Sequence, residues 1–343
     1  MLFVKELEIK MQTYYDKLSQ AVMLLQKALK TSYTDALAEA LTDLANGEVY
    51  VENGAPDQDT VEKLKVIYDE LKEINLSQTE MKQAITVNII SAQKLDKTEV
   101  NKLVTPDTIG LITSLIAYEI LNAENVKNFN LVDPTIGTGN LLIEFVEQLK
   151  LAGDFKINIA GIDNDDISLG LAKAFTEVMN LNLSAYHQDG IADWQFTDVD
   201  MAIADLPVGY YPIDENASRF ETKADEGHSY AHHLLIEQTM NSLNENGVGI
   251  FVVPSQIFQT DQAKKLSQWM VQNVYLQAVL DLPGNLFASK EAQKAVVILQ
   301  KHGTKAQQSA KVLMGTIPNT NDPKLFEGFK NQVQDWAKKT FKG

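Results

Sequence analysis

Cysteine is absent from the 343-residue chain. Without a thiol there can be no disulfide, no thiolate zinc site, no iron–sulfur cluster and no cysteine nucleophile. Long apolar runs are absent too, and the opening MLFVKELEIK carries charges where a signal peptide needs an uncharged apolar segment. We therefore expect a cytoplasmic protein with no membrane partner.

Arginine is nearly absent as well. Arg219 is the only arginine among 30 basic residues, and the formal net charge is −16. Arginine is the commonest reader of guanine edges, and basic patches drive phosphate binding, so the surface as a whole does not indicate a nucleic-acid-binding protein. A local lysine patch is still compatible with this net charge. The same net charge is also found in ordinary acidic cytosolic proteins.

Residues 1–100 show helical periodicity and no convincing long strand. We predict helices over residues 7–29, 33–46 and 60–74, with a small hairpin or loop at Asn53-Gly54. A further helix begins at Ser77, where Glu80 completes a capping box. These residues are predicted to form an all-helical module.

From about residue 101 the pattern changes to short β-rich runs with helical spacers between most of them. This alternation predicts an α/β domain over residues 101–300, with a seven-stranded, doubly wound and mainly parallel sheet. The predicted strands are residues 129–133, 157–163, 183–187, 200–205, 247–253, 276–281 and 295–300. Because the last two are too close for a helical crossover, we expect the final strand to be antiparallel.

Residues 301–343 are predicted to be a C-terminal extension that ends in an amphipathic helix. Leu325, Phe326, Phe329, Val333 and Trp336 share one broad face of that helix. We expect this face to dock on the helix's own domain rather than on a partner.

The segment LVDPTIGTGNLLIEF predicts a strand, a tight glycine turn and the start of a helix. Gly137 and Gly139 allow the chain to turn sharply and to approach a ligand closely. A dinucleotide-binding fingerprint would need a third glycine where Leu142 stands. A nucleoside cofactor without a pyrophosphate therefore fits better.

Acidic residues follow three successive predicted strands: Asp133, Asp163 and Asp189. An acid at Asp163 can accept hydrogen bonds from both ribose hydroxyls, and Asp189 is placed to bind an adenine amino group. Together the three carboxylates would suit a cationic sulfonium. Capping of the following helices is the alternative interpretation.

These motifs resemble those of a known family. The segments TPDTIGLI, DPTIGTG, GID, QDG and ADLPV, in this order, are similar to the motif series of class I S-adenosylmethionine-dependent methyltransferases. Within that class the likeness is to the amino-methylating, adenine-specific DNA methyltransferases, near the type I restriction modification subunits and their stand-alone bacterial relatives. It covers about residues 101–300 and implies a Rossmann-like fold with S-adenosylmethionine as the cofactor.

Carried over by position, the resemblance implies that Thr105 and Pro106 touch the methionine end of the cofactor. It also implies that Asp133 and the two glycines wrap the cofactor, that Asp163 holds the ribose and that Asp189 holds the adenine. The predicted cofactor site comprises Thr105, Pro106, Asp133, Thr135, Gly137, Thr138, Gly139, Asp163, Asn164, Asp189 and Gly190.

In the family, the acceptor motif is Asn, Asp or Ser followed by two prolines and an aromatic residue, whereas this chain has Asp205-Leu206-Pro207-Val208. The first side chain and the next backbone carbonyl accept the two amine hydrogens, and the aromatic stacks on the flipped base. Leu206 loosens a turn that proline would stiffen, and Val208 cannot stack. Tyr210 or Tyr211 can take over the stacking role of that aromatic residue. The predicted catalytic residues are therefore Asp205, Leu206, Pro207 and Tyr210.

His228, His232 and His233 lack a third ligand at a convincing zinc spacing, and we predict no metal site. The leading function is methyl transfer to an amino group, with adenine as the acceptor. A catalytically degenerate, cofactor-binding regulatory or assembly protein is one alternative, and methylation of a protein or RNA amine is another. Nucleic acid is expected to be reached through a partner subunit, and the N-terminal helices are expected to bind a second copy or another protein.

Overall fold

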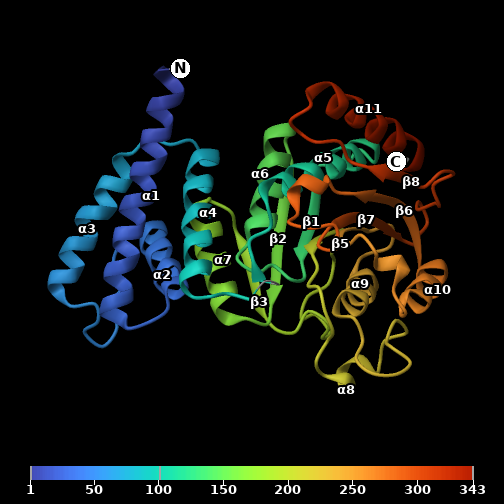
Figure 1. Ribbon diagram of the computed structural model, residues 1–343, viewed down its shortest axis with the longest axis horizontal. Coiled ribbons are helices and arrows are strands. Elements are labelled where there is room, and N and C mark those ends of the chain that lie inside the picture. Colours follow the sequence, from blue (N-terminus) through green and yellow to red (C-terminus); the bar gives the residue numbers. More distant parts are fainter. Residues whose placement is uncertain (1, 100–101, 342–343) are drawn as a thin grey trace.

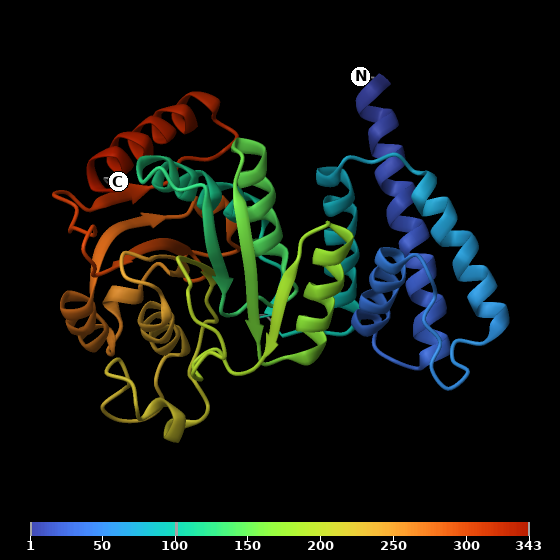
Figure 2. The ribbon, with the colours of Figure 1, turned by 180° about the vertical axis from the view of Figure 1, so that it is seen from behind.

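The computed structural model describes residues 2–99 and 102–341. A helical part lies beside a larger part that contains one β-sheet, and both views show the two side by side (Figures 1 and 2). The helical part consists of α1 (Leu2–Leu29), α2 (Tyr33–Asn46), α3 (Gln58–Glu73) and α4 (Gln78–Leu95).

The local signals in this part are confirmed. Ser77 Oγ accepts a hydrogen bond from the Glu80 N–H, and the Glu80 carboxylate accepts one from the Ser77 N–H at 2.7 Å, which is the predicted capping box. Asn53 and Gly54 have φ values of 53° and 80°, and Glu52 pairs with Ala55 across them. This two-residue turn is the predicted hairpin.

Eight strands form one sheet in the order β3-β2-β1-β4-β5-β7-β6-β8. The seven predicted strands are all present: β1 (Asn128–Asp133), β2 (Lys156–Asp163), β3 (Leu183–His187), β4 (Met201–Asp205), β5 (Val248–Pro254), β6 (Val274–Asp281) and β7 (Lys294–Lys301). The β7 strand is antiparallel to both β5 and β6, as predicted. Strand β8 (Leu313–Thr316), parallel to β6, was not predicted because its four largely exposed residues carry no apolar alternation.

Helices cover both faces of the sheet. On one face lie α5 (Asp107–Ala123), α6 (Asn140–Ala152), α7 (Asp166–Val178) and α11 (Pro323–Thr340); on the other lie α9 (Ala231–Ser242) and α10 (Ala263–Asn273). The short helices α8 (Asp214–Ala217), η2 (Ile257–Gln259) and η3 (Gly284–Leu286) belong to connections. In β1, Leu131 packs into the first layer and Val132 into the second, as expected for a strand buried on both faces.

The C-terminal helix α11 lies beside α5, over the sheet (Figure 1). Phe329, Val333 and Trp336 are buried there, which confirms docking on its own domain. Leu325, at the start of the helix, is 60% exposed and does not contribute to this contact.

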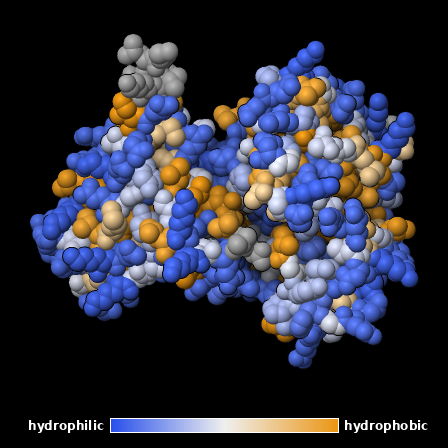
Figure 3. Space-filling model, viewed as in Figure 1, coloured by the Kyte–Doolittle hydropathy of each residue, from blue (hydrophilic) through white to orange (hydrophobic). Residues whose placement is uncertain are grey.

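The helical part is joined to the sheet part through apolar contacts between α2 and α7. Hydrophobic side chains line an indentation between the two parts on the face shown in Figure 3. The expected boundary at residues 100–101 lies outside the described residues, so the division into three domains stays a prediction. Within residues 2–99 and 102–341, no helix has both the length and the apolar character that crossing a bilayer requires.

Candidate active site

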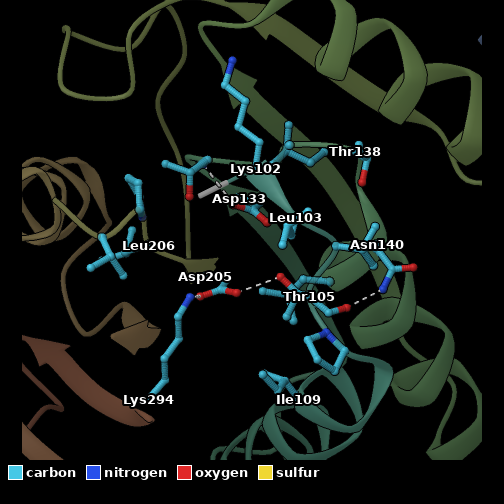
Figure 4. A pocket seen from close by; sticks show the side chains of 18 of the residues that line it. Lys102, Leu103, Thr105, Ile109, Asp133, Thr138, Asn140, Asp205, Leu206 and Lys294 are labelled. Atoms are coloured by element: carbon cyan, nitrogen blue, oxygen red, sulfur yellow. Dashed lines mark hydrogen bonds and ion pairs between the residues drawn. The ribbon is translucent and has the colours of Figure 1, made fainter. Parts of the chain in front are cut away.

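A cavity of about 360 Å³ opens at the carboxyl edge of the sheet, beside β1 and β4. The strand order reverses between these two strands, and ligands of open α/β sheets bind at such a switch point. The structure brings most of the predicted residues to this cavity, as Figure 4 shows in part. Those that line it are Thr105, Pro106, Asp133, Thr135, Gly137, Thr138, Asp205, Leu206 and Pro207.

The glycine turn forms one wall of the cavity. Gly137 and Gly139 have φ values of 53° and 84°, in the left-handed region that favours glycine. A Cβ atom on Gly139 would lie 3.2 Å from the Cβ of Ala172, so the turn is also packed closely against α7. The hydroxyl of Thr135 is buried with no hydrogen-bond partner among the described residues. A polar ligand in the cavity would supply that partner.

Asp163 supports this turn. Its carboxylate accepts hydrogen bonds from the Gly137 N–H at 2.8 Å and from the Asp165 N–H at 2.9 Å. Burial raises the pKa of Asp163 above its ordinary value, and it raises the pKa of the fully buried Asp133 much further. The negative charge that Asp133 and Asp163 contribute is therefore smaller than the sequence analysis expected.

Asp189 does not line the main cavity. One of its oxygens accepts a hydrogen bond from the Tyr211 hydroxyl at 2.5 Å, and the other accepts one from the Ile191 N–H at 3.1 Å. It borders a separate hollow that also includes Asn216 and Arg219. Gly190 lines neither of these two hollows, and the carbonyl of Asn164 lies 3.2 Å from His187 Nε2. Adenine binding by Asp189 stays a prediction.

Asp205 also lines the cavity, at the end of β4. Its Oδ2 accepts a hydrogen bond from Thr105 Oγ1 at 2.8 Å, and its Oδ1 lies 2.5 Å from Lys294 Nζ. Both donors point toward the carboxylate in Figure 4. Two elements far apart in the sequence thus fix the orientation of this side chain.

Leu206 does not leave the acceptor turn loose, contrary to expectation. Its side chain is fully buried, and its N–H donates a hydrogen bond to the Val252 carbonyl of β5 at 3.0 Å. Proline has no N–H and could not make this bond. The turn is therefore anchored by burial and by an extra rung of the sheet.

The aromatic residues take different places from those expected. Tyr210 stacks on Tyr230, with ring centroids 4.8 Å apart, and is not among the described residues that line the cavity. Tyr211 is buried against Asp189. Phe287, which the sequence analysis did not single out, lines the cavity with Val208. The stacking role of Tyr210 stays a prediction, and Phe287 is a second candidate.

Asn140 and Lys294 were also missed. Asn140 begins α6, donates to the Thr105 carbonyl at 2.7 Å and to Asp107 at 3.0 Å, and accepts a hydrogen bond from Thr86 of α4. Lys294 could have been identified, because an antiparallel final strand must begin at the carboxyl edge of its neighbours. A lysine at the start of that strand therefore lies beside the site.

The three histidines take different environments. His228 is exposed and lies 2.9 Å from Asp214, whereas His232 and His233 are buried in α9. Burial lowers the pKa of His232 to about 4 and that of His233 to about 3, so both are neutral at physiological pH. Helix packing accounts for these two residues.

We expect Asp163→Ala to weaken S-adenosylmethionine binding by about 1–3 kcal/mol, because the ribose hydroxyls and the Gly137 N–H lose their acceptor. Isothermal titration calorimetry measures this change. Asp166→Ala is the matched control, since Asp166 is an exposed acid of the adjacent helix turn and bonds only locally. Equal affinities for wild type and Asp163→Ala would remove Asp163 from the binding site.

The raised pKa of Asp163 adds a pH test. As the pH falls through that raised pKa, the carboxyl takes up a proton and loses capacity to accept hydroxyl hydrogens, so cofactor affinity should fall with the pH, starting above the ordinary range of an aspartate. Asp163→Asn should lose that part of the pH dependence. The same slope in both proteins would assign it to another group.

Comparisons with known proteins agree with this geometry. The model of the family described as N-6 DNA Methylase matches residues 92–335. The uncharacterized protein YtxK of Bacillus subtilis is 33% identical over 332 residues, which cover 95% of this chain and 97% of YtxK. Because the match covers 95% of this chain, the likeness to YtxK includes the N-terminal helices.

Solved structures give the same result. A Listeria monocytogenes protein assigned to the class I S-adenosylmethionine-dependent methyltransferases is 31% identical, with a TM-score of 0.84 over 96% of this chain and 99% of that one. The methyltransferase subunit of a type I restriction-modification system from Streptococcus thermophilus has a TM-score of 0.61 at 16% identity, over 91% of this chain and 73% of that one. The second likeness concerns the fold alone.

Proposed function

Because this chain belongs to the N-6 DNA methylase family and is an S-adenosylmethionine-dependent methyltransferase, we propose that it methylates an amino group, with adenine in nucleic acid as the acceptor. The observation that supports this acceptor is the position of Asp205. Its carboxylate lies in the same cavity as the glycine turn and accepts a hydrogen bond from Thr105, one of the predicted cofactor residues. S-adenosylmethionine, when bound, supplies an electrophilic methyl group on a sulfonium.

The residues of the cavity would orient the acceptor without forming a covalent bond to it. Asp205 and the Leu206 carbonyl accept the two hydrogens of the amine, which directs its lone pair toward the methyl group. Thr105 and Lys294 hold Asp205 in place. Phe287 or Tyr210 provides the aromatic face on which a base can stack. The proton released after transfer passes to solvent.

Access to DNA through a partner subunit is part of this proposal. The single arginine, Arg219, already donates hydrogen bonds within the chain, to Asp193 at 2.6 Å and to Gln238 at 3.2 Å. With a net charge of −16, the isolated chain is expected to bind duplex DNA weakly and with strong salt dependence.

A cofactor-binding regulatory protein without catalysis is the second candidate. The observation in its favour is that Asp205 is already engaged by Lys294 and Thr105, while Val208 stands where the family has an aromatic residue. This candidate predicts binding of S-adenosylmethionine without transfer to any acceptor.

One experiment separates the two candidates. The protein is incubated with S-adenosylmethionine carrying a labelled methyl group and with total DNA, RNA and protein from cells, and the labelled products are identified by mass spectrometry. The proposal predicts N6-methyladenine. Label in methyllysine or methylglutamine would contradict adenine as the acceptor, and cofactor binding without any product would favour the regulatory protein.

A further inference from the structure

The start of β7 brings a positive charge to the acceptor carboxylate. Asp205 of β4 is in register with Val252 of β5, and Pro254 at the end of β5 is in register with Lys294. Because β7 runs antiparallel, its first residue lies at the edge where β4 ends. Lys294 Nζ reaches Asp205 Oδ1 across the end of β5, at 2.5 Å.

The carboxylate keeps room for an acceptor. An ionised carboxylate has about four acceptor positions, and two of them are used by Lys294 and by Thr105. The remaining positions can take the hydrogens of an amine. Asp205 is mostly buried, with 16% of its side chain exposed, so an acceptor that reaches it loses most of its contact with water.

The charge of the acceptor therefore matters. An uncharged NH₂ group adds hydrogen bonds to Asp205 and leaves its ion pair with Lys294 intact. An alkylammonium group would place a second positive charge beside the Lys294 ammonium, and like charges at such short range repel strongly where water is scarce. Lys102, the other lysine among the described residues that line this cavity, is paired with Asp165 and does not add to the positive charge beside Asp205.

We propose that Lys294 is a specificity-determining residue that holds Asp205 and restricts the methyl acceptor to an uncharged NH₂ group, either an exocyclic base amine or a carboxamide. Alkylammonium groups, such as a lysine side chain in a protein, are rejected. This inference rests on the proposed function, since it concerns the acceptor of the same site. Lys294 acts through Asp205 and is a positioning residue.

The test measures binding rather than turnover. The protein is saturated with S-adenosylhomocysteine, and 9-ethyladenine and n-butylammonium are titrated as neutral and cationic probes, with binding followed by NMR. Wild type is expected to bind 9-ethyladenine at least about tenfold more tightly than n-butylammonium. In Lys294→Met, n-butylammonium should gain about tenfold while 9-ethyladenine changes by less than about threefold.

Two further variants exclude a merely structural effect. Lys294→Arg keeps the positive charge and should restore the wild-type ratio of affinities. Lys265→Met removes a lysine that pairs with Asp225 outside the cavity and should leave the ratio unchanged. Equal ratios in wild type and Lys294→Met, tight n-butylammonium binding by wild type, or no binding of either probe would each overturn the proposal. Failure of the proposed function shows separately, as absence of labelled product.

Discussion

Asp205→Ala is expected to lower the rate of methyl transfer by roughly a hundredfold or more while leaving S-adenosylmethionine affinity within about threefold. The rate falls because Asp205 is the side chain in the DLPV segment that can accept an amine hydrogen, and an unoriented amine rarely directs its lone pair at the methyl group. Affinity is expected to be kept because the predicted cofactor contacts come from residues that follow β1, β2 and β3 and from the segment before α5, of which only Thr105 bonds to Asp205. Single-turnover kinetics and calorimetry measure the two quantities.

Asp205→Asn is the informative control. Asparagine keeps one acceptor oxygen and the size of the side chain, so it should retain a larger part of the rate than alanine does. If Asp205→Ala turns over a confirmed acceptor at the wild-type rate, the DLPV segment is not the acceptor site. A parallel loss of affinity and rate would instead make Asp205 part of the cofactor site.

Lys82→Met is expected to destabilise the protein by about 3–5 kcal/mol, the range for breaking a buried ion pair by removing one partner. Lys82 of α4 is 1% exposed, lies 2.6 Å from Asp107 at the start of α5, and also pairs with the buried Glu144 of α6. The methionine variant would leave Glu144 charged and buried without its cation. Urea unfolding measures the change in the free energy of unfolding.

Two control variants show whether the loss of stability comes from the buried ion pair. Lys63→Met removes an exposed pair with Asp59 on α3, and its urea midpoint should equal that of wild type. The double variant Lys82→Met/Glu144→Leu should recover much of the lost stability, because no uncompensated charge remains in the core. A Lys82→Met protein as stable as wild type would show that water already reaches the cluster of Lys82, Asp107 and Glu144.

The cluster also connects the helical part to the active site. Asp107 and Asn140 share a hydrogen bond of 3.0 Å, and Asn140 holds the Thr105 carbonyl. Thr105 in turn donates to Asp205. A chain of polar contacts thus runs from α4 to the acceptor carboxylate, so the helical part has a structural role at the site in addition to any partner it binds.

The sequence predicted those features that depend on neighbouring residues. The glycine turn requires two left-handed positions within three residues, and the β-rich runs are long enough to identify seven strands. The antiparallel final strand followed from the short connection between residues 281 and 295. Strand β8 escaped because its sequence, Leu313 to Thr316, is short, contains Gly315 and is mostly exposed.

Contacts between distant residues were not predictable in this way. Lys294 and Asp205 are 89 residues apart, and Lys82 and Glu144 are 62 apart, so no local pattern connects them. Asp189 lies outside the main cavity and accepts a hydrogen bond from the Tyr211 hydroxyl, 22 residues further along the chain. The resemblance placed Asp189 by its position after β3, but it carried no information about this local hydrogen bond.

Methyl transfer to a defined oligonucleotide tests the central claim most directly. Two single-stranded DNA oligonucleotides, identical except that one contains a single adenine and the other an unsubstituted purine at that position, are incubated with labelled S-adenosylmethionine and the protein. We expect label in the adenine oligonucleotide alone, and its loss with Asp205→Ala. Equal labelling of both oligonucleotides would contradict transfer to adenine, and label that persists in Asp205→Ala would contradict an acceptor amine held by Asp205.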